Sequence, residues 1–454
     1  MPEPATPAPA GQLWGKETSL AIANFPVSGR RLPIEVIHAL AALKAEAADV
    51  NLELEAPGIT AEIAGAISAA AGAVERGDHD DQFLIDVFQT GSGTSSNMNV
   101  NEVVARLAGD AAGSVVHPND HVNAGQSSND TFPTAVAVAA LRAITADLRP
   151  ALELLASSLE SAADRFGDVV KAGRTHLMDA VPVTLGAEFG GYAAQVREAI
   201  ERLDDCAPRL GRVPLGGTAI GSGLNAHPEF GQRVVQRVAT RWSIPLSVAP
   251  NRYAAQASRD AVVEASAQLR GLAMALMKIA NDVRWMGSGP SAGLGEIRLP
   301  ELQAGSSIMP GKVNPVMSEM LTQVCVQVFG NDAAVAFAGS QGAFELNTYQ
   351  PVMAANVLES IRLLTAGCRL FAERCVDGIE ADEERCRQLA EASPSIATAL
   401  NAALGYDRVS ALVKQAVRER RSIIDVVVES GALDRATAER LVDVRQMAAG
   451  GPPD

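Results

Sequence analysis

A long apolar stripe constrains the fold of this chain more than any other feature of its sequence. Within residues 258–286, apolar side chains recur at alternating spacings of three and four residues, namely Leu269, Leu272, Leu276, Ile279, Val283 and Met286. This spacing places them along one side of a long α-helix, where water must be excluded by partner helices. The stripe therefore predicts a bundle of long helices.

Composition and further helical segments support an all-α fold. Of the 454 residues, 47% are hydrophobic but only 4% are aromatic, which favours closely packed helices over a sheet of aromatic and β-branched pairs. We expect long helices at 131–166, 185–203, 315–339 and 352–374, and shorter ones at 33–50 and 59–74. Pro150 should bend or break the first of the long helices.

The spacing of these segments predicts three domains. Residues 1–124 hold short helices broken by Gly and Pro, residues 125–380 hold the long helices, and residues 381–454 hold shorter, charged amphipathic pieces. We expect a central helix-bundle domain flanked by two smaller, mainly helical domains. Long Ala-rich helices usually also bury faces between subunits, so we expect a homo-oligomer.

Charge, cysteine content and hydropathy exclude several classes of partner. The formal charge of −15 disfavours nucleic acid and anionic membranes. The five cysteines form no CxxC pair, which indicates reduced thiols and a cytoplasmic protein. Residues 1–10 are interpreted as a Pro/Ala-rich tail without a targeting signal. The most apolar stretch, 136–144, is interrupted by Arg142 and is expected to be too short to span a bilayer.

Four polar segments interrupt the apolar helices and are candidates for chemistry. The first, 89–99, is a Gly-rich turn before a helix, where free amides and hydroxyls can hold a carboxylate or phosphate. Taken alone, this segment is better explained as an ordinary capped turn. The second and third are 117–121 and 126–130. Ser127, Ser128, Asn129 and Asp130 are all good N-caps, yet a helix uses only one.

Metal binding is disfavoured at the second segment. His117 and His121 are four residues apart, but Pro118 interrupts a helix through the pair and the Glu of a zincin helix is missing. The fourth segment, 173–182, holds His176 among small and polar residues. A lone His is usually structural, and it gains a catalytic role only beside a carboxylate and a substrate site.

The segment from Gly305 to Pro315, Gly-Ser-Ser-Ile-Met-Pro-Gly-Lys-Val-Asn-Pro, is the most specific of all. Its Gly and Ser residues permit a mobile loop, and Asn314 and Pro315 are expected to be the N-cap and first residue of a helix. Lys312 beside the amides of a helix start suits an enolate-like or carboxylate oxygen. A solvated loop with a surface Lys is the alternative.

This last segment matches the signature GSSxMPxKxNP of the fumarase/aspartase superfamily. Residues 88–103, 117–134 and 173–192 resemble the family's other signatures, in the family's order, and the likeness covers almost the whole chain from about Leu13. Within the superfamily the chain resembles class II fumarases, because aspartases usually carry Gln where this chain has His176. The resemblance implies a long-helix bundle at the centre of a homotetramer, with each active site shared by three subunits.

The resemblance also implies roles for individual residues in the reversible hydration of fumarate to (S)-malate through an aci-carboxylate carbanion. Ser306 would be the base at carbon, Lys312 would stabilise the resulting charge, and His176, oriented by Glu319, would act through water at the oxygen side. The remaining substrate-binding residues would be Ser92, Gly93, Thr94, Ser127, Ser128, Asn129, Thr175, Ser307 and Asn314. His117, Asn119 and Asp120 resemble a second, peripheral dicarboxylate site. No metal or other cofactor is implied, and the reaction belongs to the tricarboxylic acid cycle.

Two alternatives and two departures stay open at the level of sequence. An aspartate ammonia-lyase, or a related C4-dicarboxylate lyase, would use the same carbanion chemistry with another leaving group. A non-catalytic structural protein on this fold is disfavoured by the presence of Ser306, His176, Lys312 and Glu319. The chain departs from the family pattern where Leu20 stands in place of an Arg, and again within 342–349.

Overall fold

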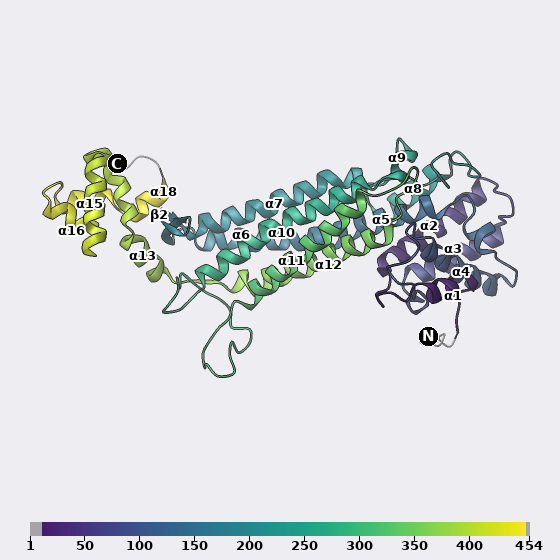
Figure 1. Ribbon diagram of the computed structural model, residues 1–454, viewed down its shortest axis with the longest axis horizontal. Coiled ribbons are helices and arrows are strands. Elements are labelled where there is room, and N and C mark those ends of the chain that lie inside the picture. Colours follow the sequence, from purple (N-terminus) through teal and green to yellow (C-terminus); the bar gives the residue numbers. More distant parts are fainter. Residues whose placement is uncertain (1–10, 451–454) are drawn as a thin grey trace. The chain divides into compact units, whose positions relative to one another are not determined.

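The computed structural model describes residues 11–450, and they are predominantly α-helical, as predicted (Figure 1). In this part of the chain the strands form three two-stranded sheets, β1 with β2, β3 with β4 and β5 with β6. The strands are β1 Val170–Thr175, β2 Met178–Thr184, β3 Arg212–Val213, β4 Ser247–Val248, β5 Ile297–Arg298 and β6 Glu380–Ala381. The residues form two compact units, each built from three stretches of sequence.

The first unit comprises residues up to Pro150, together with 199–273 and 324–366. Its helical elements are α1 Lys16–Asn24, α2 Ile34–Glu53, α3 Ala61–Glu75, η1 Asp80–Gln82, α4 Thr94–Ala112, η2 Pro118–Val122, α5 Ser128–Ala143, η3 Ile144–Leu148, α8 Phe230–Trp242 and α9 Arg252–Ala257. Helix α2 is its centre, because it packs against α3, α5 and α8 and is buried along most of its length (Figure 1). The two helices predicted at 33–50 and 59–74 are confirmed as α2 and α3.

The second unit comprises 151–198, 274–323 and the chain from Gly367 onward. Its C-terminal elements are η4 Val376–Gly378, α13 Glu383–Ala392, η5 Pro394–Leu400, α14 Asn401–Leu404, α15 Tyr406–Glu419, α16 Ile423–Glu429, α17 Arg435–Leu441 and α18 Val444–Ala449. These short helices share a core of their own, which includes Ile396, Leu400 and Val427. Helices α13 and α18 pack on the β1–β2 hairpin, so the hairpin rests on a folded base.

Four long helices contribute residues to both units: α7 Leu185–Leu210, α10 Asp260–Met286, α11 Val316–Gly339 and α12 Gln350–Arg374. They confirm the long helices predicted from the sequence. The six side chains of the predicted stripe on α10 are all at most 3% exposed. The 3-and-4 spacing therefore identified a buried helix face correctly.

Pro150 shapes the fifth long helical stretch in a specific way. Helix α6, Arg149–Arg165, follows the π-helical turn η3 directly, so Ser128–Arg165 is one helical run of 38 residues. A proline ring clashes with the carbonyl four residues before it, and the wider π turn lies at that position. The run is long and apolar enough to cross a membrane, which corrects the expectation from sequence. However, 72% of its most apolar window is buried inside the protein, as in an ordinary core helix.

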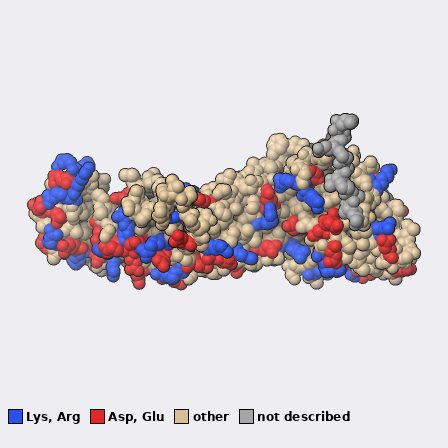
Figure 2. All heavy atoms as spheres, turned by 90° about the horizontal axis from the view of Figure 1, so that it is seen from below, with Lys and Arg blue, Asp and Glu red and all other residues tan. Residues whose placement is uncertain are grey.

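Surface charge and cysteines agree with the expectations from composition. On the face drawn in Figure 2, acidic and basic side chains are interspersed rather than gathered into one large area of a single sign. All five cysteines are buried and form no disulfide, and burial raises the thiol pKa of Cys206 to about 11 and of Cys325 to about 12. The division into domains 1–124, 125–380 and 381–454 stays a prediction.

Candidate active site

The Gly-rich turn before α4 is a compact arrangement of hydroxyls. Gly93 is the N-cap of α4 with φ +77°, and a Cβ there would lie 2.3 Å from the ring of Phe132. Only glycine fits both restrictions. The turn brings Ser92 Oγ within 2.7 Å of Thr94 Oγ1, while Ser96 is held by Gln89 Oε1. The helix predicted after this turn is α4, which extends to Ala112.

The start of α5 explains the excess of capping residues in 127–130. Ser127 is the N-cap: its hydroxyl accepts the Asn129 amide, and the Asp130 carboxylate accepts the Ser127 amide, which completes a capping box. Ser128 Oγ accepts a bond of 3.0 Å from Asn97 Nδ2, and Asn129 Nδ2 donates to the Ala219 carbonyl. Four adjacent residues therefore have four distinct partners, and Ser128 and Asn129 are fixed in place rather than free.

A buried lysine supports this segment, and sequence reasoning did not identify it. Lys44, in the middle of α2, is fully buried and donates to Asn123 Oδ1 at 2.8 Å and to Gln126 Oε1 at 2.9 Å. Asn123 Oδ1 also accepts from Asn97 and Asn101 of α4. One polar network thus joins α2, α4 and the loop before α5. Burial lowers the pKa of Lys44 from 10.5 to about 7.

Asp130 connects the same segment to residues nearly ninety positions away. Its carboxylate accepts the amides of Gly216 at 3.0 Å and Thr218 at 2.8 Å, besides the capping bond to Ser127. Burial raises the pKa of Asp130 to about 6. These hydrogen bonds favour the ionised form and lower the pKa, but their effect is smaller than that of burial. Asp130 therefore organises the backbone around Ser128 and Asn129.

His117, Asn119 and Asp120, the residues of the predicted peripheral site, share one tight turn. His117 is the N-cap of the π-helical turn η2, and its Nδ1 accepts the amides of Asn119 and Asp120. The Asp120 carboxylate lies 3.1 Å from the same nitrogen. Among residues 11–450 no group of three or more His, Cys, Asp or Glu side chains is arranged to hold a metal ion.

In the second unit, His176 stands at the tip of the β1–β2 hairpin. Thr175 pairs with Met178, so His176 and Leu177 are the two central residues of the turn, with φ of +56° and +58°. Such turns usually place Asn or Gly at these positions, and a larger side chain costs about 1 kcal/mol there. The side chains of Thr175, His176 and Leu177 are exposed. The fold therefore accepts local strain in order to present His176 outward.

The hairpin is anchored by buried ion pairs at its base. Lys171, 2% exposed, lies 2.8 Å from Glu188 and 3.4 Å from Glu296, and Arg174 forms two hydrogen bonds with the fully buried Glu296. Planar, bidentate pairing of this kind fixes orientation as well as distance. The tip that carries His176 is thus held on a rigid stem.

The loop before α11 is closed by its own backbone and left open to solvent. The Gly305 amide donates to the Lys312 carbonyl at 3.0 Å, and Asn314 Nδ2 donates to the Gly305 carbonyl at 2.7 Å. A Cβ on Gly305 would lie 2.0 Å from the Lys312 oxygen, so the closure requires glycine. Helix α11 begins at Val316, one residue later than predicted, because Asn314 closes the loop instead of capping the helix.

Within this loop Ser306 has a distinctive hydrogen-bonding position. Its Oγ accepts the amides of Ile308 at 3.2 Å and Met309 at 3.1 Å. Two N–H groups directed at one hydroxyl oxygen favour negative charge on that oxygen. Ser307 and Lys312 are exposed, and within residues 11–450 the Lys312 ammonium has no ion-pair partner. The loop therefore offers a charge-stabilised hydroxyl together with a free cation.

The predicted residues divide into two groups according to the unit in which they lie. The first consists of Ser92, Gly93, Thr94, Ser127, Ser128 and Asn129, and the second of Thr175, His176, Ser306, Ser307, Lys312, Asn314 and Glu319. Glu319 lies on the first turn of α11 with an exposed side chain. Inside the described chain no hydrogen bond or ion pair joins it to His176. Both groups present hydroxyls, amides or cations suited to carboxylates.

Comparisons with known proteins identify the family of this chain. A family model described as lyase matches residues 6–330, and one described as fumarase C C-terminus matches residues 396–449. A class II fumarate hydratase of Mycobacterium tuberculosis is 56% identical over 446 residues, covering 97% of this chain and 93% of the relative. That of Corynebacterium glutamicum is 55% identical, with 97% and 94% covered. A crystal structure of recombinant class II fumarase from Schistosoma mansoni superimposes with a TM-score of 0.94, at 35% identity, and covers 97% and 96%.

Proposed function

Because this chain belongs to the class II fumarate hydratase family, we propose that it hydrates fumarate reversibly to (S)-malate and that the two groups of residues described above carry the reaction. The identity of 56% over nearly the full length supports the activity. The assignment of roles depends above all on one observation in the Gly305–Asn314 loop. Two backbone amides donate hydrogen bonds to Ser306 Oγ, and Lys312 of the same loop forms no ion pair within the described residues.

Ser306 is the base at carbon. In the dehydration direction its oxygen takes a proton from the carbon next to the malate carboxylate, and the C–H electron pair moves into that carboxylate to give an aci-carboxylate. A free hydroxyl is a poor base at neutral pH. The amides of Ile308 and Met309 stabilise the deprotonated oxygen, and this supports the role.

The developing negative charge is stabilised by the rest of the loop. Lys312 supplies a full positive charge, and Ser307 supplies a hydroxyl donor. Asn314 keeps the end of the loop fixed through its bond to the Gly305 carbonyl. Stabilisation aimed at the intermediate rather than at the substrate is what lowers the barrier.

His176 acts at the oxygen side of the reaction. In the dehydration direction it donates a proton, through a bound water, to the departing hydroxide, so that water and fumarate are released. Its exposed place on an anchored hairpin tip supports this role, because the imidazole is held in position yet free to contact substrate. Glu319 orients the imidazole and stabilises its protonated form.

The first group binds the dicarboxylate. Ser92, Thr94, Ser127, Ser128 and Asn129 offer hydroxyl and amide groups at two helix starts, where unpaired N–H groups and the helix dipole favour anions. Burial of Ser92 and Ser128 and the network around Lys44 support a preformed pocket. His117, Asn119 and Asp120 form the peripheral dicarboxylate site.

The active sites are shared between subunits of a homotetramer. Helix α11 exposes three large apolar side chains, Val326, Phe329 and Phe337, the last of them 69% exposed. An exposed apolar helix face of this kind is typical of a subunit interface. Partner subunits also account for the exposed positions of His176, Lys312 and Glu319. Glu319 of one subunit orients His176 of another, and the enzyme works in the cytoplasm as part of the tricarboxylic acid cycle.

A direct assay tests the activity. The purified protein is incubated separately with malate and with aspartate, and fumarate formation is followed by its ultraviolet absorbance. We expect product from malate alone. Product from aspartate alone would replace the hydratase by an ammonia-lyase.

Complementation tests the sharing of sites. We expect the His176→Asn and Ser306→Ala variants to be nearly inactive alone. When the two are unfolded together, mixed in equal amounts and refolded, random assembly leaves about one quarter of the sites free of both substitutions if the two residues come from different chains. Recovery of about a quarter of the wild-type rate is expected. No recovery, with tetramers formed, would mean that one chain supplies both residues.

A further inference from the structure

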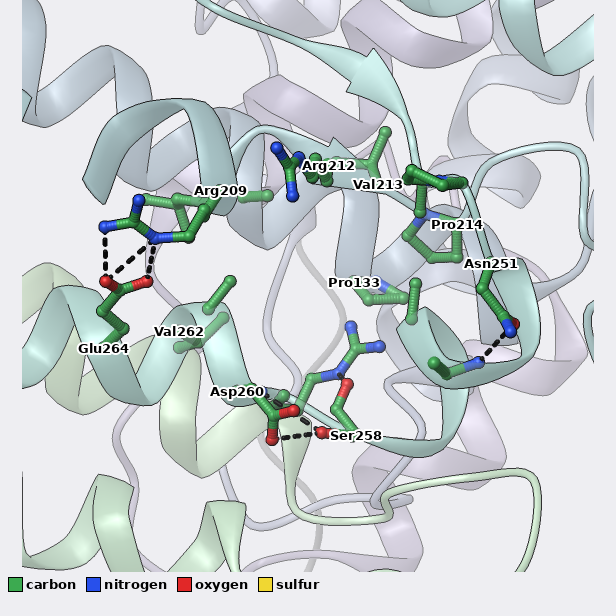
Figure 3. A pocket seen from close by; sticks show the side chains of 18 residues that line it. Pro133, Arg209, Arg212, Val213, Pro214, Asn251, Ser258, Asp260, Val262 and Glu264 are labelled. Carbon is green, nitrogen blue, oxygen red and sulfur yellow. Dashed lines mark hydrogen bonds and ion pairs between the residues drawn. The ribbon is translucent and has the colours of Figure 1, made fainter. Parts of the chain in front are cut away.

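A cavity distant in sequence from every proposed catalytic residue lies in the first unit. It has a volume of about 530 Å³, within the range of small-ligand pockets, and is lined by residues of α5, the end of α7, β3, α9 and the start of α10. Pro133, Val213, Pro214 and Val262 provide apolar walls (Figure 3). The charged groups at this cavity are three arginines, Arg209, Arg212 and Arg259, and two carboxylates, Asp260 and Glu264.

Both carboxylates already have other partners. Glu264 forms a multiple hydrogen-bonded ion pair with Arg209 at one edge of the cavity. The Asp260 carboxylate accepts a hydrogen bond from the Ser258 hydroxyl, away from that pair (Figure 3). Neither acid forms an ion pair with Arg212 or Arg259 among the described residues, although the nearby charge of Asp260 raises the pKa of the Arg259 guanidinium.

Arg259 is the unusual member of this group. The residue is only 8% exposed, and its one hydrogen bond runs from Nε to the Ser258 carbonyl. Its two terminal nitrogens have no partner within residues 11–450. Burial lowers the pKa of Arg259 to about 10, so the side chain is still charged at neutral pH. A buried guanidinium whose terminal nitrogens make no hydrogen bond is costly, and its free edge is shaped to bind an oxyanion in a bidentate manner.

We infer that this cavity binds a small organic anion, with its carboxylate or phosphate on the free edge of Arg259 and its apolar body against Pro133, Pro214 and Val262. Arg212, exposed at the cavity, contributes long-range attraction. None of the lining residues has been assigned to the reaction.

Binding of two fluorescent probes tests the inference and identifies the oxyanion. Titration of the assembled wild-type protein with 2-naphthoate and with 2-naphthyl phosphate, in saturating malate to occupy dicarboxylate sites, is expected to show saturable binding of at least one of them. Preference for one probe distinguishes carboxylate from phosphate. The uncharged 2-naphthylmethanol should bind at least about tenfold more weakly, because it cannot pair with the guanidinium.

Three variants locate the binding. Arg259→Met should weaken probe binding at least about tenfold while the protein stays folded, because the lost cation has no structural ion pair to leave behind. Ala254→Trp should also weaken probe binding, because the larger side chain narrows the cavity while Arg259 itself is unchanged. Ser306→Ala should bind the probe like the wild type. Failure of both probes to bind, or equal binding by Arg259→Met and wild type, would overturn the inference. Loss of binding in Ser306→Ala would assign the probe to the active site instead.

Discussion

The two groups of predicted site residues differ in how they are held. Ser92 and Ser128 are buried, and the start of α5 is fixed by Lys44, Asn97 and Asp130 through hydrogen bonds that reach across the first unit. In the second unit His176 and Lys312 are exposed. The loop that carries Lys312 is held by hydrogen bonds within the loop itself, and the hairpin that carries His176 is anchored at its base. In the proposed function, the residues that bind substrate are therefore preformed within one subunit, whereas the residues proposed for the chemistry would be completed by substrate and by neighbouring subunits.

The largest expected effect is on turnover, from a substitution in the second group of site residues. Ser306→Ala should lower turnover by roughly a hundredfold or more, because it removes the proposed base, while the melting temperature changes little. Turnover on malate and a thermal melt measure the two quantities, and Ser19→Ala on the exposed side of α1 is the matched control. A wild-type rate in Ser306→Ala would contradict the role of this hydroxyl.

A pair of glycine substitutions sharpens the contrast between the groups. Gly93→Ala should destabilise the protein by about 3 kcal/mol, because φ is positive and the new methyl would overlap the Phe132 ring. Gly305→Ala opens a solvent-exposed loop, so turnover should fall by about tenfold with little change in stability. Denaturant unfolding measures the stability of both variants, and kinetics on malate measure their turnover. Equal losses of stability would show that the loop is as integral to the fold as the α4 turn.

A smaller effect is expected on the pH dependence of stability, through Lys44, which supports the first group of site residues. Above pH 7 the folded chain loses this proton, whereas the unfolded chain keeps it until pH approaches 10.5. Unfolding therefore takes up a proton, and stability should rise with pH from 7 towards 10, relative to Lys44→Met, by about 1 kcal/mol per pH unit.

Denaturant titrations at several pH values measure the slope for Lys44. The control is Lys414→Met at an exposed position of α15. If wild type and Lys44→Met have parallel pH dependences, Lys44 is not a titrating part of the network.

The smallest expected effect is that of a chelator. Neither group of site residues contains a set of side chains that could hold a metal, so dialysis against EDTA should leave turnover on malate unchanged. Activity that is lost and then restored by a divalent cation would show that a metal acts in one of the two groups.

The sequence by itself determined the local features of this protein. Helical periodicity identified the long helices and the buried stripe of α10, and short motifs identified every segment that carries the proposed site. The sequence placed an N-cap within 127–130 but did not choose Ser127, and it gave Gly305 no role beyond a mobile loop. The same reasoning was wrong for Asn314, which closes the loop instead of capping the helix. At Pro150 the helix is not broken but contains a π turn, and whether it bends there stays a prediction.

Only the tertiary structure decided which distant groups meet. Lys44 binds residues about eighty positions away, Asp130 binds amides beyond position 215, and Arg259 lines a cavity built from five elements. No periodicity or motif reveals such partners, because a buried polar group is satisfied by whatever the packing of other elements places beside it. Spacing along the chain determines a helix, whereas the long-range packing determines which polar groups are paired and which are left free for a ligand.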